Sequence, residues 1–152
     1  MKPVFTEKQR FNQWWLWVLL LAISAAPLMV LYKEVVTNSL SKNSLWIVFI
    51  LLLSVFLFAV LQLKTTITNS NIQLTYIPFV NKSIHLSDID TMRVINYGFV
   101  GGWGIRLWTS YGTVYNVRGN KGLHIKLKNG KQLVIGTQKP QELEKIVTQL
   151  GF

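Results

Sequence analysis

Two long stretches of the chain carry no formal charge, and after residue 64 the pattern changes to alternating apolar and polar positions. The first stretch, residues 11–32, lies between Arg10 and Lys33, and the second, residues 43–63, lies between Lys42 and Lys64. As a helix, the first would be about 33 Å long, enough to cross the hydrocarbon core of a bilayer. We therefore predict a membrane hairpin over residues 1–64, with spans at about residues 12–32 and 44–63.

The residues within and beside these stretches limit the functions that the hairpin could have. A tryptophan cluster beginning at Trp14 and a tyrosine at Tyr32 lie at the two ends of the first stretch, as aromatic residues do at membrane interfaces. Neither stretch contains an Asp, Glu, His, Lys or Arg residue, which argues against a proton relay and so against a transporter. Ser54 is expected to bond to its own preceding helical turn. Small residues before Pro27 raise a cleaved signal peptide as an alternative, but the stretch is longer than such segments usually are, and we favour an uncleaved span.

Basic residues predict the orientation of the hairpin. They occur at positions 2, 8 and 10 before the first stretch and at Lys64 after the second, whereas the connection between the stretches carries Lys33 and Lys42. The positive-inside rule therefore places the N- and C-termini of this multi-pass protein in the cytoplasm.

Alternation over residues 65–152 predicts a small β domain. The segment IQLTYIPF follows the turn NSN and places Ile72, Leu74 and Tyr76 on one face. In LHIKLKNGKQLVIG, the pair Asn129-Gly130 favours a two-residue hairpin turn of type I′, with His124 on the surface. Further strands are predicted in KSIHL, TMRVINY, GIRLWT and TVYNVR.

A helix ends this domain. In KPQELEKIVTQLG, Pro140 suits a first helical position, and Leu143 and Val147 fall on the apolar stripe of a helix that packs on a core. The pattern predicts an α+β domain in which seven or eight short strands form an antiparallel β barrel or sandwich capped by this one helix.

The β region resembles a known family. The segments TITNSNIQLTYIPFVNKSIHLSDIDTMRV and GNKGLHIKLKNGKQLVIGTQKPQELEKIV, behind a membrane hairpin, resemble the bacterial pleckstrin-homology-like (PH-like) domain membrane proteins. The most specific part is the succession of strand, NG turn, strand, GTQKP and helix, and the resemblance covers about residues 65–152. It implies a PH-like fold and a location in the bacterial cytoplasmic (inner) membrane. Many members of this family are uncharacterised, so the resemblance lends no catalytic residues.

The stretch NYGFVGGWGIRLW invites comparison with phosphate-binding loops. Gly102-Trp103-Gly104 begins like a dinucleotide fingerprint, but Leu107 stands where the third glycine is needed, and a strand rather than a helix follows. We interpret the stretch as the end of one strand at about Tyr97, a glycine-rich bend and the start of the next strand.

No pattern indicates catalysis, a cofactor or a metal site, and we predict that the protein is not an enzyme. The chain has no cysteine. His85 and His124 lie on separate predicted strands without an acidic cluster nearby. Asp88 and Asp90 fall in a turn, where aspartates commonly bond backbone amides.

The net charge of +10 predicts an anionic neighbour, and for a membrane-tethered domain the nearest is the lipid surface. Nucleic acid is disfavoured because the basic residues are spread over strands. The candidate residues for contact with lipid or a partner are Trp103, Arg106, Trp108, Arg118 and Lys121. Each of Trp103, Arg106 and Arg118 suits the core as well as the surface.

These observations predict a non-enzymatic membrane protein that presents a PH-like domain at the cytoplasmic membrane face. The partner would be another membrane protein or a second copy, with anionic phospholipid headgroups as a further contact. The alternative is an accessory or assembly subunit of a larger membrane complex, in which the β domain is a spacer.

Overall fold

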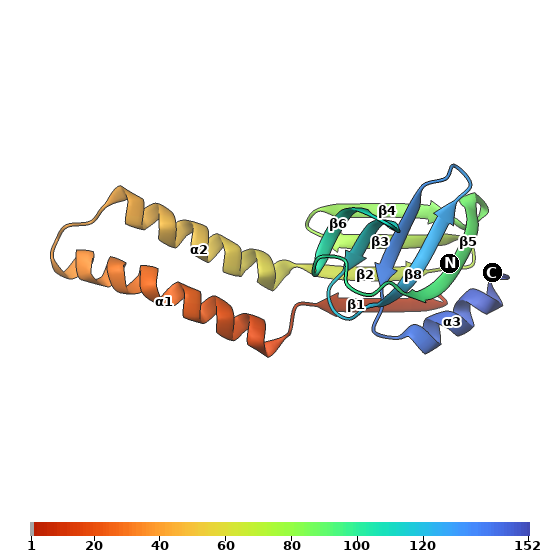
Figure 1. Ribbon diagram of the computed structural model, residues 1–152, viewed down its shortest axis with the longest axis horizontal. Coiled ribbons are helices and arrows are strands. Elements are labelled where there is room, and N and C mark those ends of the chain that lie inside the picture. The colour runs from red at the N-terminus through yellow and green to blue at the C-terminus, as the bar shows by residue number, and fades with distance from the viewer. Residues whose placement is uncertain (1) are drawn as a thin grey trace. The chain divides into compact units, whose positions relative to one another are not determined.

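The computed structural model describes residues 2–152 of the 152-residue chain (Figure 1). The chain divides into two compact units. We call Phe11–Leu61 the helical hairpin, and residues 2–10 together with Gln62–Phe152 the β domain. The hairpin is thus an insertion in the sequence of the β domain.

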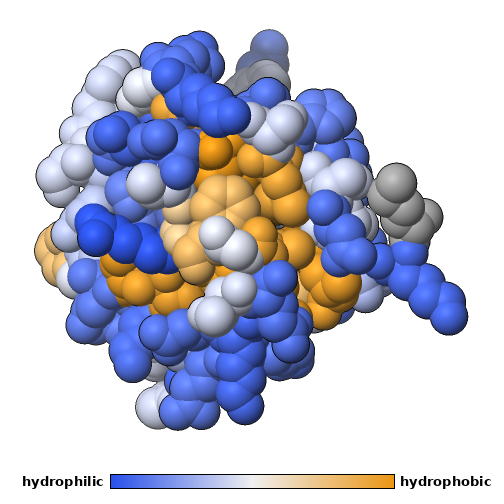
Figure 2. Space-filling view, turned by 90° about the vertical axis from the view of Figure 1, so that its right-hand side faces the viewer, coloured by the Kyte–Doolittle hydropathy of each residue, from blue (hydrophilic) through white to orange (hydrophobic). Residues whose placement is uncertain are grey.

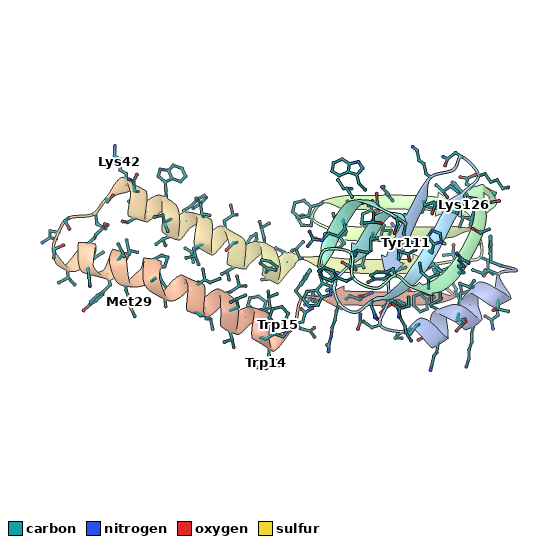
Figure 3. All side chains as sticks on the ribbon, in the orientation of Figure 1. Trp14, Trp15, Met29, Lys42, Tyr111 and Lys126 are labelled. Carbon is teal, nitrogen blue, oxygen red and sulfur yellow. The ribbon has the colours of Figure 1, made fainter. Side chains whose placement is uncertain are left out.

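The helical hairpin consists of α1 (Trp14–Val36) and α2 (Lys42–Val60). Both helices are long and apolar enough to cross a membrane, which agrees with the two apolar helices predicted from the sequence. Apolar side chains project from both helices along their length (Figure 3). Their buried residues are serines, Ser24 and Ser44, rather than the apolar residues that a water-soluble helix would bury.

Ser54 and Glu34 make local hydrogen bonds within the hairpin. The hydroxyl of Ser54 donates to the carbonyl oxygen of Leu51 at 2.7 Å, which confirms its predicted bond to the preceding turn. At the connection between the helices, the carboxylate of Glu34 accepts from the backbone N–H of Ser41 at 3.1 Å and from the hydroxyl of Ser44 at 2.7 Å. Glu34 therefore ties the end of α1 to the start of α2 and satisfies a free donor there.

The first sheet of the β domain is antiparallel, with its strands in the order β1-β2-β3-β4. The strands are β1 (Phe5–Arg10), β2 (Gln62–Ile67), β3 (Asn71–Ile77) and β4 (Val80–His85). β1 pairs with β2 from Phe5 opposite Ile67 to Arg10 opposite Gln62. The two strands on either side of the helical hairpin in sequence are therefore direct neighbours in the sheet.

This pairing corrects the predicted boundary between residues 64 and 65. The β domain includes β1, and β2 begins at Gln62. Leu63, predicted to end the second span, is fully buried in the core of the β domain. An uncharged run in the sequence does not distinguish residues of a membrane span from residues of a protein core, because both environments exclude water. The sequence pattern did not predict β1, because two of its inward positions, Glu7 and Gln9, are polar.

The second sheet has the order β5-β8-β9-β7-β6. Its strands are β5 (Ile89–Asn96), β6 (Gly104–Thr109), β7 (Gly112–Asn116), β8 (Lys121–Leu127) and β9 (Gln132–Gly136). Over residues 2–152 the two sheets have nine strands, where seven or eight were predicted. β7 and β9 are parallel, with Val114 opposite Val134, so the prediction of a purely antiparallel domain is wrong at this pair. The connection from β7 to β9 passes through β8, and it is long enough for a parallel crossover.

The core of the β domain lies between the two sheets and under one helix. α3 (Pro140–Gln149) packs against β5 and β8 and buries Leu143 and Val147, as predicted. The face shown in Figure 2 has an apolar centre surrounded by hydrophilic residues. The fully buried core side chains include Leu63, Ile67, Ile72, Leu74, Val114, Leu123, Ile125, Val134 and Ile135.

The β8–β9 turn is longer than predicted. Gly130 has a φ of 81°, but Asn129 does not adopt a positive φ. The backbone N–H of Leu127 donates to the carbonyl oxygen of Lys131 at 2.8 Å, which leaves three residues in the connection. A three-residue turn needs a positive φ at its last position only, and glycine supplies it there.

His124 is buried, which corrects its predicted surface position. Its imidazole shares a hydrogen bond of 3.0 Å with the side-chain oxygen of Gln132, and its ring lies 5.9 Å from that of Tyr111, edge to face. Successive residues of β8, from Gly122 to Ile125, are all buried, so both faces of this strand are covered near His124.

Candidate functional site

The glycine-rich segment between β5 and β6 is a bend between two strands, as predicted. β5 ends at Asn96 and β6 begins at Gly104. Because β6 is a strand, the bend lacks the helix N-terminus that would receive a pyrophosphate. The glycines with positive φ here are Gly98, Gly101, Gly102 and Gly104. Residues other than glycine adopt a positive φ only at a cost in free energy, so the path of the loop depends on these glycines.

Asn116, at the end of β7, holds this loop in place. Its side-chain oxygen accepts from the backbone N–H of Gly104 at 2.9 Å. Its side-chain nitrogen donates to the hydroxyl of Tyr97 at 3.2 Å and to the carbonyl oxygen of Gly102 at 3.4 Å. Its own carbonyl oxygen accepts from the hydroxyl of Tyr76 at 3.3 Å. The side chain and the backbone carbonyl of the buried Asn116 thus join the loop, the second sheet and β3 of the first sheet.

A hollow of about 440 Å³, which we call the loop hollow, lies beside this bend. Phe99 at its rim is 89 % exposed, and Trp103 is 37 % exposed. The hollow is lined by Gly98, Phe99, Val100, Gly102, Trp103, Asn116, Gly119 and Asn120. Among the described residues, the lining includes two aromatic side chains and does not include a charged one.

Arg106 and Trp103 lie at the boundary between core and surface. The guanidinium of Arg106 donates to the carbonyl oxygen of Trp103 at 2.8 Å. A Cβ atom on Gly102 would lie 2.7 Å from the same guanidinium, so a side chain there would displace the end of the Arg106 side chain. Burial raises the pKa of Tyr76 to about 12, and the nearby positive charge of Arg106 opposes that rise.

A second hollow of about 600 Å³, the edge hollow, lies between the edge strands β4 and β6. Its exposed side chains include Trp108, which is 95 % exposed, and Leu107. Trp108 has a φ of 55°, an uncommon value for a bulky residue, and the β6–β7 register shifts at this point. Lys82, which also lines the hollow, donates from its Nζ to the hydroxyl of Tyr115 at 2.8 Å.

The five predicted contact residues do not form one site. Trp103 and Arg106 lie at the loop hollow, whereas Trp108 lies at the opposite end of β6, beside the edge hollow. Arg118 and Lys121 are exposed on either side of two residues that line the loop hollow. The structure therefore groups Trp103, Arg106, Arg118 and Lys121 around one hollow and separates Trp108 from them.

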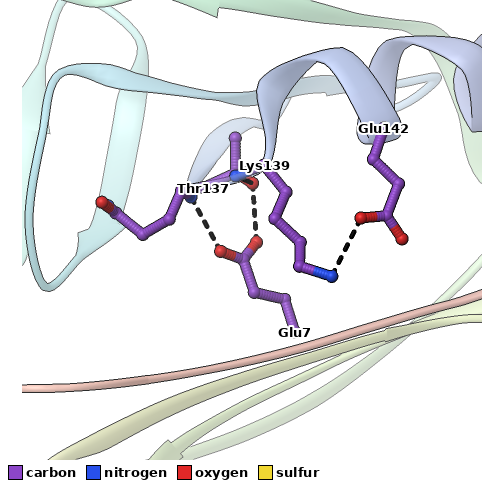
Figure 4. A network of polar contacts seen from close by, with 5 residues as sticks. Glu7, Thr137, Lys139 and Glu142 are labelled. Atoms are coloured by element: carbon purple, nitrogen blue, oxygen red, sulfur yellow. Dashed lines mark hydrogen bonds and ion pairs between the residues drawn. The ribbon is translucent and has the colours of Figure 1, made fainter.

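Glu7, a residue that sequence reasoning passed over, fixes the start of α3 (Figure 4). Its buried carboxylate accepts from the hydroxyl of Thr137 at 2.6 Å and from the backbone N–H of Gln138 at 2.7 Å. Beside it, the Nζ of Lys139 lies 2.9 Å from the carboxylate of Glu142. The hydrogen bond and the charge of Glu142 raise the pKa of Lys139. These contacts explain the segment GTQKP as a turn held by β1, and the sequence signal was a lone acidic residue at an inward position.

The remaining titratable residues do not form a site. Within residues 2–152, no three His, Cys, Asp or Glu side chains lie close enough together to hold a metal ion. His85 is exposed, whereas His124 is buried on another strand. Asp90, predicted in a turn, is on β5 and lies 3.5 Å from the Nζ of Lys126.

Comparison of the chain with protein-family models, curated proteins and solved structures finds no match. The comparisons therefore assign no family. The structure shows two sheets and a C-terminal helix, and the PH-like resemblance stays a prediction from the sequence.

Proposed function

We propose that the chain is a non-enzymatic protein of the bacterial cytoplasmic membrane that holds a PH-like binding module at the cytoplasmic face. The observation that carries this proposal is the insertion of the helical hairpin between β1 and β2. Because these strands pair from Phe5 to Arg10, both ends of the hairpin must lie on the same side of a membrane that it crosses. The β domain is then attached to the membrane through two adjacent strands.

Exposed aromatic side chains favour a binding module over a spacer. Phe99 and Trp108 are almost fully exposed, each beside a hollow in the surface. Aromatic residues at interfaces commonly supply much of the binding free energy, whereas a spacer gains nothing from exposing them to water. We therefore propose a protein partner, another membrane protein or a second copy of this chain, at these two positions.

The cytoplasmic placement is supported by the distribution of basic residues. Lys8, Arg10 and Lys64 belong to the β domain close to the hairpin, whereas Lys33 and Lys42 lie at the far ends of the two helices. The positive-inside rule favours the more basic side as cytoplasmic, and it adds anionic lipid as a further contact of the domain.

Site-specific crosslinking of the full chain in its native membrane tests this function. A photo-crosslinking amino acid at position 99 or 108 should give a discrete adduct, and the same group at the exposed Thr148 of α3 serves as the control. An adduct of twice the chain mass would identify a second copy. Normal accumulation with no adduct above the control at either position would overturn the binding-module proposal. The same crosslinking amino acid can also be placed in α1 or α2. Adducts from those helices, without adducts from positions 99 and 108, would instead favour the accessory subunit with the domain as a spacer.

A further inference from the structure

The register of the first sheet gathers basic side chains on its outward face. Along β1, Phe5, Glu7 and Gln9 are buried, and the residues between them are exposed. In one outward row Lys8 lies directly opposite Lys64. In the next outward row Arg10 lies opposite a glutamine, Gln62, and its Nε donates to the side-chain oxygen of that residue at 3.0 Å. We call Lys8, Arg10 and Lys64 the basic face.

Within residues 2–152, the residues of the basic face do not take part in an ion pair. Like charges directly opposite each other on paired strands are destabilising. The nearest acid in sequence, Glu7, points to the opposite face and is engaged by Thr137 and Gln138. The two ion pairs observed within residues 2–152 involve other lysines, Lys126 and Lys139. The outward residues of β3 and β4 do not include an acid and are Asn71, Gln73, Thr75, Ile77, Asn81, Ser83 and His85.

The basic face is also close in sequence to both apolar helices. Lys8 precedes the start of α1 at Trp14 by six residues, and Lys64 follows the end of α2 at Val60 by four. At about 3.5 Å per extended residue, the chain separates them from the helix ends by at most about 21 Å and about 14 Å. A lysine side chain extends several ångströms further, so headgroups around the two helices are within reach.

We propose that the basic face binds the phosphate groups of anionic phospholipids, with Lys8 and Lys64 sharing one phosphate. Each ammonium group brings three hydrogen-bond donors, and a shared anion between them replaces their mutual repulsion by attraction. Phe79, in the β3–β4 turn at the same end of the first sheet, is 61 % exposed and supplies an apolar contact beside the headgroup. This inference rests on the membrane placement proposed above.

Lipid titration of the full chain, purified in an uncharged detergent, tests this site without reference to membrane orientation. Short-chain phosphatidylglycerol should raise the unfolding temperature in a saturable manner that high salt weakens. Short-chain phosphatidylcholine and inorganic phosphate serve as the neutral-lipid and free-anion probes and should not do so at equal concentration. K8Q/K64Q should weaken the apparent affinity for phosphatidylglycerol about 25-fold, from about 1 kcal/mol per basic residue. The matched control K128Q/K145Q removes two exposed lysines elsewhere on the β domain and should retain the affinity.

Equal affinity in K8Q/K64Q and the control would overturn the basic face as the site, as would a chain that does not respond to phosphatidylglycerol. An equal response to inorganic phosphate would replace the lipid with a free anion and would also contradict the proposal. Crosslinking at positions 99 and 108 is measured separately, so adducts there without a lipid response would leave the binding-module function standing while the lipid site fails.

A charge-reversal variant guards against a loss of lipid binding through misfolding. Lys8→Glu places opposite charges across β1 and β2, so it should raise the unfolding temperature without lipid and abolish the response to phosphatidylglycerol. K8R/K64R keeps both charges and should retain the response. A lipid response that survives in Lys8→Glu would contradict the proposal.

Discussion

Asn116 occupies a position where one side chain satisfies several backbone and hydroxyl groups of the glycine-rich loop. In Asn116→Ala, the N–H of Gly104 and the carbonyl oxygen of Gly102 would lose their bonds to this side chain, and each unsatisfied buried group costs about 1–3 kcal/mol. The hydroxyl of Tyr97 would keep its bond to the carbonyl oxygen of Gly119. We expect the free energy of unfolding of the β domain to fall by roughly 3 kcal/mol, with faster hydrogen exchange over residues 97–104. Hydrogen-exchange mass spectrometry of the full chain in detergent measures both effects.

Asn120→Ala is the matched control for Asn116→Ala. Asn120 lines the same hollow but is exposed, so its side-chain amide is hydrated rather than buried. We expect its loss to leave exchange over residues 97–104 within a factor of two or so of the wild type, as for most surface substitutions. Equal acceleration in the two variants would show that Asn116 does not hold the loop.

Tyr76 makes the stability of the β domain depend on alkaline pH. Burial raises its pKa to about 12 from an ordinary value of 10, so the folded state holds the phenolic proton more tightly than the unfolded state does. The stabilisation from the neutral phenol is complete below pH 10 and is lost as the pH rises from about 10 to about 12. Burial raises the pKa of Tyr97 as well, so that residue acts in the same direction.

We expect Tyr76→Phe to lower the stability near pH 8, because its hydroxyl bond to Asn116 is lost, and to flatten the decline above pH 10. The measurement is the denaturation midpoint of the full chain in detergent as a function of pH, for the wild type and the variant. Parallel curves above pH 10 would show that Tyr76 does not cause the decline.

At the level of elements, the sequence predicted best where apolar residues define the inward face. β3 buries the predicted face of Ile72, Leu74 and Tyr76, and β9 occupies the predicted segment QLVIG. α3 buries Leu143 and Val147 as its apolar stripe indicates. β1 could not be recognised in this way, since Glu7 and Gln9 face inward to bind the backbone of residues 136–138. Such partners are distant in sequence and become visible only in the folded chain.

The candidate site was predictable in composition but not in arrangement. The glycine-rich bend and its aromatic residues followed from the sequence, and the structure places Trp103 and Arg106 there. A regular strand would carry Arg106 and Trp108 on the same face, but the register shift before Thr109 turns Trp108 away. A bulge depends on the fit to the neighbouring strand, so spacing in the sequence alone does not reveal it.

The turn between β6 and β7 depends on the absence of a side chain at Gly112. Its φ is 76°, and a Cβ atom there would collide with the carbonyl oxygen of Gln132 on β9. Gly130 has a similar φ of 81°, but open space surrounds its would-be Cβ. Gly112→Ala should therefore destabilise the β domain by roughly 3 kcal/mol, against about 1 kcal/mol for Gly130→Ala. Unfolding of the two variants in detergent measures the difference, and equal costs would show that backbone strain alone, not the close approach to β9, decides it.

For the whole molecule, the pairing of Arg10 with Gln62 shows how a soluble β domain can be made. Replacing Phe11–Leu61 by the dipeptide Asn-Gly should close β1 and β2 with a tight hairpin turn and leave the remaining contacts of the domain intact. We expect this shortened chain to be folded and soluble without detergent, with dispersed amide signals in its NMR spectrum.

A fragment of residues 65–152 is the informative comparison. It lacks β1 and the first residues of β2, so Phe5 and Leu63 are missing from the core and the Glu7 contacts to the start of α3 are lost. We expect it to be unfolded or aggregated under the same conditions. A well-folded fragment would show that β1 is dispensable for the fold.

The insertion of the helical hairpin within a pair of strands also sets an order of events during synthesis. β1 leaves the ribosome first and has no partner until all of Phe11–Leu61 has been translated. Closing so long a loop in solution carries an entropic cost, but a hairpin that enters the membrane brings its two ends together before β2 emerges. Membrane insertion would then nucleate the first sheet. Without insertion, β1 would stay unpaired and open to recognition by chaperones and proteases.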